Sequence, residues 1–392
     1  DMIRRKHQAT NSTNSVGGLI PAAATARISW LDRITVLLGA NRRRGFTVSR
    51  RIIVVVILGL STQTRSIAQL LPQGNPARLE EGRHSESKVP SCVQSLLKNE
   101  HAILANATLS EKLISFRVLL HPHDKYITRK IKQKGTYEPE MEEFVARAFP
   151  LNAEENTLRS QNPAVWAVDI GANIGFHTMH IAQRGANVIS FEPAPDTAEL
   201  LKCTASELLD DAAVTNGGCV GSIRVVEAGA SDAESAGKMS RHPDSPGMTT
   251  FVGNNSSFPL EELKNRDGTT TTAAGMIRLL RADNVLAGYG VPEGRSDFLR
   301  LLKVDAEGFE LRALRGINLT RFPFQLLTFE FFPEMLGASG EDPVDLLMFV
   351  RDAEYECDYE KKLPATSGAT RNELNSWVSG IKSHVNVFCE LK

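Results

Sequence analysis

Short apolar runs alternate with stretches of helical periodicity in the part of the chain that follows residue 163. The apolar runs cover residues 165–170, 187–191, 223–228, 299–304 and 325–331, and the helical stretches cover 176–184, 196–209 and 307–315. Strands that alternate with helices predict βαβ units and a parallel sheet that helices cover on both faces. The alternating pattern of residues 384–391 predicts one final strand, antiparallel to the others.

The segments around this pattern are more irregular. Residues 126–134 and 139–149 are predicted to form helices, because Gly135 breaks the first and Pro139 with its following acids suits the start of the second. Residues 71–120 are interpreted as a linker and helical extension, with the polar stretch 71–95 as the linker. The segment 232–275, rich in Ser, Thr, Gly and Asn, is predicted to be an irregular insertion with a hairpin.

Residues 1–70 form a basic arm, with eleven Lys and Arg residues against two acids. Its apolar run, residues 52–60, is too short to span a hydrocarbon core, which takes about 20 residues. The run suits the apolar region of a signal peptide, and Ser66-Ile67-Ala68 offers small residues for cleavage before Gln69. We therefore predict a targeting segment or membrane-surface anchor, with entry into the secretory pathway favoured. An organelle transit peptide is one alternative, and a disordered tail before a buried strand is another.

Charge and cysteine usage narrow the classes of partner and site. The whole chain has a net charge of −1, so the body that follows the basic arm is acidic, which argues against a nucleic-acid partner. N-x-S/T sequons support a secretory route only weakly, because such tripeptides arise by chance; they begin at Asn11, Asn106, Asn254, Asn255 and Asn318. The odd number of scattered cysteines, without a CxxC pair, predicts small buried side chains rather than a zinc site or disulfide scaffold. These are Cys92, Cys203, Cys219, Cys357 and Cys389.

The segment from Asp169 to Gly175, DIGANIG, lies at a predicted strand-to-helix turn. Gly171 and Gly175 allow the backbone to turn sharply and to approach a ligand closely. With Asn173 between them, they do not match the dinucleotide fingerprint G-x-G-x-x-G. Asp169 would repel a pyrophosphate by about 4 kcal/mol at ~4 Å and an effective dielectric near 20. The same carboxylate would attract the sulfonium and ammonium of S-adenosylmethionine, which we therefore predict as the cofactor.

Glu192 ends the next predicted strand, 23 residues after Asp169. A carboxylate there can accept hydrogen bonds from both hydroxyls of a ribose, in NAD as well as in S-adenosylmethionine. On its own it is equally an ordinary solvated residue at a strand end. Together with the glycine turn it predicts a nucleotide-binding crevice.

The segment LLKVDAEGFE, residues 301–310, is a second strand-to-helix junction. Asp305 is predicted to point into the same crevice as Asp169, because ligands of such sheets bind beyond the carboxyl ends of adjacent strands. It would contact the methionyl end of the cofactor or orient the acceptor, although an N-cap is an alternative role. Glu307 has the same two candidate roles, in the active site or at the start of the helix, and the sequence favours neither. Glu310 is attributed to the helix dipole.

These segments resemble the FkbM family of methyltransferases. The similarity lies in VDIGANIGFHT (168–178), VISFEPAP (188–195), VVEAGASD (225–232), LLKVDAEGFELRALRGI (301–317) and VNVFCEL (385–391). It extends over about residues 124–392 and places the domain at 121–392, with its core at 163–392. The resemblance implies a class I, Rossmann-like α/β fold with a mostly parallel seven-stranded sheet, helices on both faces and an antiparallel last strand. It also implies methyl transfer to a hydroxyl oxygen of a sugar-like or other small acceptor.

The resemblance also implies roles for individual residues. Asp305 and Glu307 are the candidate catalytic acids. Asp232 is a candidate contact for the adenine, with an ordinary turn residue as the alternative. Tyr137 and Glu138 would close over the methionyl end of the cofactor, unless they serve only to begin the helix at Pro139. The predicted cofactor-binding residues are Asp169, Gly171, Asn173, Gly175, Glu192, Asp232, Tyr137 and Glu138.

Methylation of an alcohol benefits from a general base. Asp305, Glu307 and His177 are candidates, and a helix-face role is favoured for His177. Asp305 and Asp283 could together hold a divalent metal ion. No spacing of ligand residues requires one, however, so no metal site is predicted. Two rival functions stay open: a catalytically silent domain that binds S-adenosylmethionine or a partner, and a nicotinamide-dependent oxidoreductase. The oxidoreductase would require G-x-G-x-x-G and a small or apolar residue in place of Asp169.

Overall fold

The computed structural model describes residues 91–109, 114–151, 165–209, 220–242, 245–252, 272–358 and 368–392. The chain divides into two units, residues 1–86 and 87–392, and every described residue belongs to the second. The predicted basic arm, its apolar run and its cleavage site therefore lie outside the described residues. Within the described ranges, no helix has the length and hydropathy needed to cross a membrane.

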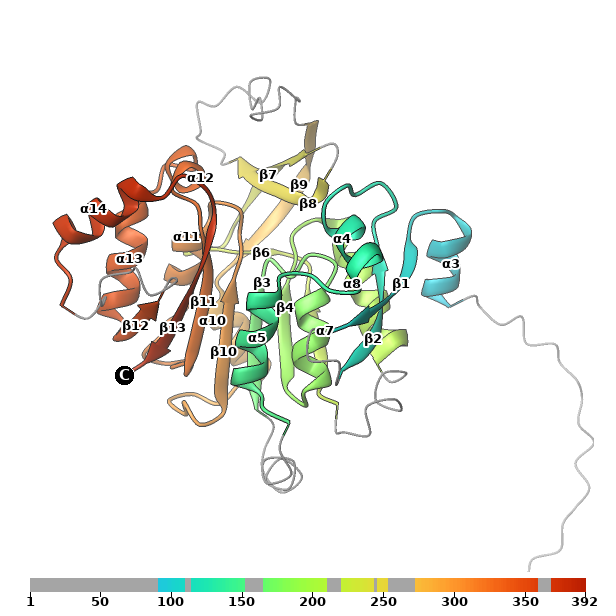
Figure 1. The fold of residues 1–392 in the computed structure, drawn as a ribbon, viewed down its shortest axis with the longest axis horizontal. Helices are drawn as coiled ribbons and strands as arrows, with labels where there is room; N and C mark the ends of the chain where they lie inside the picture. The colour runs from blue at the N-terminus through green and yellow to red at the C-terminus, as the bar shows by residue number, and fades with distance from the viewer. Residues whose placement is uncertain are drawn as a thin grey trace, which may run out of the picture. The chain divides into compact units, whose positions relative to one another are not determined.

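A seven-stranded sheet forms the centre of the second unit, with the strand order β12-β13-β11-β10-β3-β4-β5 (Figure 1). Five neighbouring strands run parallel, and β13 is antiparallel to both of its neighbours. This confirms the predicted class I architecture with an antiparallel last strand. The strands are β3 (Trp166–Ile170), β4 (Asn187–Phe191), β5 (Ile223–Val226), β10 (Leu299–Val304), β11 (Leu326–Phe331), β12 (Tyr355–Asp358) and β13 (Val385–Leu391).

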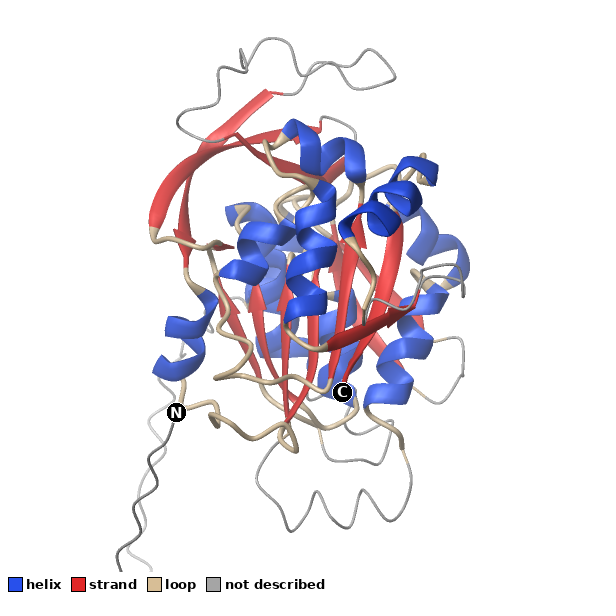
Figure 2. Cartoon of the chain, turned by 90° about the vertical axis from the view of Figure 1, so that its left-hand side faces the viewer, coloured by secondary structure: helices blue, strands red, loops and turns tan. Residues whose placement is uncertain are grey.

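Helices cover both faces of this sheet, as Figure 2 shows. On one face, Ala167, Val188 and Leu301 are buried against α5 (Pro139–Ala148) and α7 (Phe176–Gln183). On the other face, the residue that follows each of these three along its strand is buried in a larger apolar cluster. Further helices contribute to that cluster. Runs that are apolar at successive positions therefore form strands with two buried faces. The remaining helices of this cluster are α10 (Ala282–Gly288), α11 (Glu310–Arg315), α12 (Pro333–Ala338), α13 (Pro343–Asp352) and α14 (Arg371–Gly380).

A second sheet, with the order β6-β9-β7-β8, is built largely from the predicted insertion. It contains β6 (Gly229–Ala230), β7 (Ser235–His242), β8 (Ser245–Val252) and β9 (Thr272–Leu280). The predicted hairpin is present as the antiparallel pair β7–β8, but the described part of the insertion is regular strand rather than irregular chain. Local composition did not reveal this, because β7 is held by pairing with β9, far along the chain.

The chain that precedes the core is only partly helical. It contains α3 (Cys92–Lys98), the antiparallel hairpin of β1 (Ile103–Thr108) and β2 (Ser115–Leu120), and α4 (Ile127–Lys134). The interpretation of residues 71–120 as a linker and helical extension is therefore wrong for the hairpin. One reason is tertiary: β2 packs against α8 (Pro195–Cys203) and the π-helical turn η2 (Thr204–Leu208), which continues α8. The helices predicted at 126–134 and 139–149 are present.

Two disulfides connect elements that are distant in sequence. Cys92 of α3 is bonded to Cys203 at the end of α8, with a Cα–Cα distance of 5.8 Å and a separation of 111 residues. Cys357 of β12 is bonded to Cys389 of β13, with a Cα–Cα distance of 3.9 Å. The expectation that these four are unpaired buried side chains was therefore wrong, because chain folding rather than local spacing brings each pair together. Cys219 lies outside the described residues.

Candidate active site

A cavity lies at the carboxyl ends of β3, β4 and β10. The glycine turn and Glu192 line one side of it, and Asp305, Glu307 and Phe309 line another. Residues of the second sheet complete the wall. The two motifs that the sequence singled out, far apart along the chain, therefore face one cavity. The second-sheet residues at the wall are Gly229, Ala230, Met239, Ile277 and Leu279.

The two glycines of the turn pack closely against neighbouring chain segments. Gly171 has φ of +71°, and a Cβ there would lie 1.6 Å from the carbonyl oxygen of Asp305. Gly175 has φ of +86°, and a Cβ there would lie 2.1 Å from Leu201 Cδ1. Asn173 also has a left-handed backbone, with φ of 52°, and its Oδ1 accepts from the Ile174 amide at 2.8 Å. The turn thus brings bare backbone to the floor of the cavity.

Glu192 is held in the cavity wall by backbone amides. Its Oε2 accepts from the Asn173 amide and its Oε1 from the Ala194 amide, both at 2.8 Å. The side chain is only 6% exposed, and burial raises the pKa of its carboxyl to about 7. Each oxygen keeps a further acceptor position, so the carboxylate can still receive a diol.

Asp169 does not line the cavity. It is fully buried, and its Oδ2 accepts from Thr178 Oγ1 at 2.6 Å. Its Oδ1 lies 3.3 Å from Lys303 Nζ. A direct contact between Asp169 and a cationic cofactor thus stays a prediction, and in the structure the carboxylate engages Thr178 and Lys303.

Lys303 is a site residue that the sequence analysis did not single out. It is 3% exposed, and its Nζ lies 3.4 Å from Asp305 Oδ2 and donates to the carbonyl of Gly171 at 3.4 Å. Burial acts to lower the pKa of its ammonium, but the charges of Asp169, Asp305 and Glu138 outweigh burial and raise the pKa. A lysine flanked by Leu302 and Val304, close to the end of a predicted buried strand, was the signal that could have revealed it.

Asp305, Glu307 and Glu330 form a cluster in which one carboxylate oxygen of each residue lies within 4.8 Å of the other two. Glu330, near the carboxyl end of β11, was not predicted, although it occupies a strand end like Asp169 and Glu192. Burial raises the pKa of Glu307 and of Glu330 well above the ordinary value, and the neighbouring carboxylates add to this. A raised pKa makes the ionised carboxylate a stronger base than an ordinary one, which suits a proton acceptor.

Tyr137 and Glu138 come to this edge of the sheet from the residues before α5. Glu138 Oε2 lies 2.9 Å from His177 Nε2. Burial opposes ionisation of Glu138, but His177 and Lys303 lower the pKa of its carboxyl to about 2. Burial, and then the charges of Glu138 and Asp305, raise the pKa of the Tyr137 phenol. Neither residue lines the cavity, yet both interact electrostatically with the carboxylate cluster.

Left-handed backbone in residues other than glycine gathers at this site. Among the described residues it occurs at five positions, of which Glu138, Asn173 and Glu307 belong to the site. Such conformations cost roughly 1–3 kcal/mol each and concentrate at functional sites. Three residues that the sequence selected therefore share this backbone conformation at the site.

Asp232 and Asp283 are placed away from the cavity wall. The Ser231 hydroxyl donates to Asp232 Oδ1 at 3.1 Å, and Arg281 donates to the Asp232 carbonyl at 2.7 Å, so the residue sits in a hydrogen-bonded turn. Asp283 receives two hydrogen bonds from Arg281, at 3.1 and 2.6 Å. Asp283 is therefore paired with Arg281, and these contacts do not connect it to Asp305.

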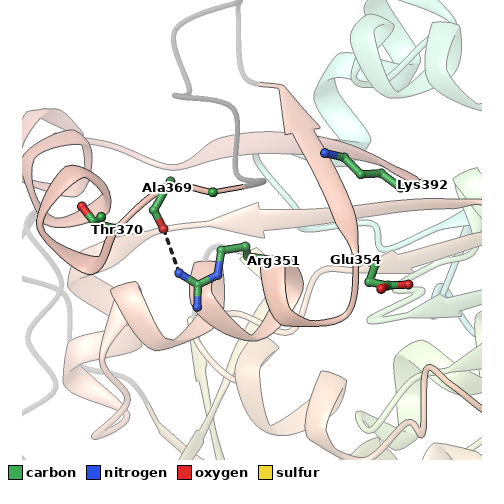
Figure 3. A pocket seen from close by; sticks show the side chains of 6 residues that line it. Arg351, Glu354, Ala369, Thr370 and Lys392 are labelled. Carbon is green, nitrogen blue, oxygen red and sulfur yellow. Dashed lines mark hydrogen bonds between the residues drawn. The ribbon is translucent and has the colours of Figure 1, made fainter.

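A second hollow, at the β12 end of the sheet, contains none of the sequence motifs. It is lined by Arg351, Glu354, Gly368, Ala369, Thr370 and Lys392. Figure 3 shows Arg351 reaching the carbonyl of Ala369, to which it donates a hydrogen bond at 2.8 Å. We assign no chemistry to it.

The cavity fits S-adenosylmethionine by its chemistry. Met239, Ile277, Leu279 and Phe309 form a buried apolar group suited to an adenine ring. Glu192 can bind the ribose, and the carboxylates beside Gly171 provide negative charge for the sulfonium and ammonium. The order of the strands, the glycine turn and Glu192 together define a class I methyltransferase fold whose cavity suits S-adenosylmethionine.

Comparison with known proteins shows what the chain is similar to. Residues 169–357, just under half of the chain, match the family model of the Methyltransferase FkbM domain. "Methyltransferase sdnD" of Sordaria araneosa is 28% identical over 169 residues, which are 40% of this chain. The match spans about three fifths (61%) of that relative's length.

Solved structures are similar only at a low level. Precorrin-6y C5,15-methyltransferase of Geobacter metallireducens GS-15 is 10% identical with a TM-score of 0.30, over 66% of this chain and 93% of its own. Magnesium protoporphyrin IX methyltransferase of Synechocystis PCC 6803, with bound SAH, is 9% identical with a TM-score of 0.28. That match covers 68% of this chain and 88% of its own. The assignment does not rest on these likenesses.

Proposed function

We propose that this domain methylates a hydroxyl oxygen of a small-molecule or glycan acceptor. The observation that carries the proposal is the carboxylate cluster of Asp305, Glu307 and Glu330, which reaches from the wall of the donor cavity to β11. An alcohol must lose its proton as it is methylated, and a carboxylate of raised pKa accepts that proton efficiently near neutral pH.

The bound cofactor supplies an electrophilic methyl group on a cationic sulfur. Binding falls to the residues of the cavity: Glu192 accepts hydrogen bonds from the ribose hydroxyls, and the apolar wall of the second sheet excludes water from the adenine. Lys303 holds Asp305 in place and cross-links β10 to β3 through Asp169. The site therefore orients the donor rigidly, and holding donor and acceptor at attack distance provides much of the rate enhancement.

The charge of the site favours some acceptors over others. Asp305, Glu307, Glu330, Glu138 and Glu310 place several carboxylates around one lysine. A phosphate backbone would be repelled there, whereas a neutral polyol would donate hydrogen bonds to the carboxylates. This supports a hydroxylated acceptor such as a sugar and disfavours a nucleic acid.

The experiment has two stages that separate this function from a silent binding domain. Isothermal titration of the full chain with S-adenosylhomocysteine comes first, and micromolar binding is expected. The chain is then incubated with deuterated-methyl S-adenosylmethionine and matched pools of alcohols, amines and thiols, and products are detected by mass. We expect labelled ethers. Labelled amines or thioethers alone would contradict the proposal, and binding without any labelled product would favour the silent domain.

A further inference from the structure

Two of the three clustered carboxylates are committed to the donor side of the site. Asp305 and Glu307 line the cavity, whereas Glu330 does not. Asp305 is also paired with Lys303 Nζ at 3.4 Å, so its Oδ2 is occupied by the ammonium. Glu307 follows it in the same loop, in a strained backbone conformation with φ of 52°.

Glu330 occupies the opposite side of the cluster. It is half-buried on β11, the strand next to β10, with one of its oxygens within 4.8 Å of one oxygen each of Asp305 and Glu307. The backbone of Glu330 is paired with β13 in the sheet, but its side chain makes no hydrogen bond or ion pair with any other described residue. The charged groups around it are Asp305, Glu307 and Glu310 after β10 and Glu138 before α5, with Lys303 beyond Asp305.

Methyl transfer from sulfur is an in-line displacement, so the attacking oxygen lies on the side of the methyl group away from sulfur. The base must therefore reach beyond the donor cavity rather than line it. We infer that the acceptor binds over the carboxyl end of β11 and that Glu330 is the catalytic base. This inference rests on the proposed function. It assigns a residue that motif analysis did not detect.

The step balances without another reactant. The acceptor O–H bond breaks and its proton goes to a Glu330 oxygen, while the new C–O bond forms. The S–C bond breaks, and its electron pair stays on sulfur, which becomes a neutral thioether. The positive charge lost from sulfur is the charge of the proton that Glu330 receives, so the site keeps its net charge.

The test compares Glu330→Gln, which keeps the shape and removes the base, with Glu199→Gln, an exposed glutamate on α8. For Glu330→Gln we expect affinity for S-adenosylhomocysteine within twofold of the parent chain and a fall in kcat of about 10²- to 10⁴-fold. The rise of kcat with pH should vanish in this variant and persist in Glu199→Gln.

Each alternative gives a different result. If the parent chain methylates alcohols and Glu330→Gln matches Glu199→Gln in kcat and pH profile, Glu330 is not the base. If the parent chain methylates no alcohol, the proposed function itself fails. Activity that disappears with EDTA and returns with Mg²⁺ would overturn the inference in favour of a cation held by the three carboxylates.

The disulfides carry a second, independent inference. Cys357 and Cys389 are direct partners in the register of β12 and β13, and Cys92 and Cys203 connect α3 to α8. The folded domain therefore contains two bonds that are rare in reducing compartments. Asn318, the first residue of a sequon, is exposed.

The second exposed sequon lies on β1, where Asn106 is exposed and the next residue, Ala107, is buried. Disulfides and accessible glycosylation acceptors are both features of chains that mature in the secretory lumen. We further propose that the domain matures in that oxidising compartment, as the apolar run at residues 52–60 also predicts, and that Asn106 and Asn318 are glycosylated there.

Expression of the full chain in a eukaryotic cell tests this. Alkylation of the purified chain without reductant should leave four cysteines unmodified, Cys92, Cys203, Cys357 and Cys389. Endoglycosidase should increase the electrophoretic mobility of the parent chain, and Asn106→Gln with Asn318→Gln should reduce that shift. Full alkylation of these four cysteines, or an unglycosylated chain that stays in the cytosol, would overturn the proposal.

Discussion

Lys303 and Asp169 are direct partners in the register of β10 and β3, and the ammonium lies 3.3 Å from the carboxylate in a fully buried position. The pair fixes the floor of the cavity, because Lys303 also reaches Asp305 and the carbonyl of Gly171. A buried charge that loses its partner is costly, so the pair makes the site sensitive to single substitutions.

Replacing Lys303 with Met should lower the free energy of unfolding by about 3–5 kcal/mol, because Asp169 and Asp305 are then buried without their counter-charge. Urea denaturation would measure the loss. The double variant Lys303→Met with Asp169→Leu removes both charges and should recover part of the stability. Equal or greater loss in the double variant would show that the pair is not the source of the effect.

Gly171→Ala should abolish measurable binding of S-adenosylhomocysteine. Its new Cβ would lie 1.6 Å from the Asp305 carbonyl oxygen, so the turn or the β10 loop must move. Gly290→Ala is the matched control: Gly290 has nearly the same φ, +72°, but nothing lies within 4 Å of the position that its new methyl group would occupy. The control should lose about 1 kcal/mol of stability from backbone strain and keep its affinity. Similar binding by both variants would contradict the close packing of the turn.

The affinity for S-adenosylhomocysteine should increase with pH between 6 and 8. Burial raises the pKa of Glu192 to about 7, and ribose hydroxyls donate to its ionised form, so binding is accompanied by proton release. We expect an increase of roughly tenfold per unit below the pKa and a plateau above it. Titration calorimetry at several pH values would measure this, and Glu192→Gln should bind weakly with no such dependence.

The same residue should also affect stability. Because its folded pKa is raised above the unfolded value, Glu192 contributes stability that is fully present below about pH 4.5 and lost as pH rises through about 7. Urea denaturation of ligand-free parent chain and Glu192→Gln over this window should show a smaller decline in the variant. A parent chain that becomes more stable from pH 5 to pH 7 relative to Glu192→Gln would contradict the raised pKa.

The apolar wall from the second sheet should contribute directly to donor affinity. Met239 is 1% exposed and lines the cavity, so Met239→Ala should weaken binding of S-adenosylhomocysteine by about tenfold or more, given roughly 1.5–3 kcal/mol for burying such a side chain. Met276 is 57% exposed and does not line the cavity, so Met276→Ala should leave affinity unchanged. Equal affinities in the two variants would show that Met239 of the second sheet does not contribute to donor binding.

Loss of either disulfide should destabilise the domain, and the loss should be slightly larger for the bond that closes the longer loop. The chain-entropy relation gives about 5 kcal/mol for the 111-residue separation of Cys92 and Cys203, and about 4 kcal/mol for the 32-residue separation of Cys357 and Cys389. Paired Ser variants, denatured without reductant, would measure both. A parent chain whose stability does not change when reductant is added would show that neither bond forms.

Much of the fold could be predicted from local pattern. The strands β3, β4, β10, β11 and β13 begin and end within a residue of the predicted runs, because a strand buried on two faces must be apolar at successive positions. The glycine turn, Glu192 and the Asp305-Glu307 loop were predicted to share one crevice, since the carboxyl ends of parallel strands lie at one edge. The structure brings these residues to one cavity.

What the sequence by itself determined is therefore the parallel sheet, its class and the edge at which the donor binds, all of which follow from short-range periodicity. Only the tertiary structure decided that Asp169 pairs with Lys303, that Glu330 joins Asp305 and Glu307, and that a second sheet completes the cavity wall. It also decided the two disulfides. Each of these depends on how chain segments that are distant in sequence are placed beside one another. That placement is set by packing over the whole core, so it cannot be predicted from a local sequence pattern.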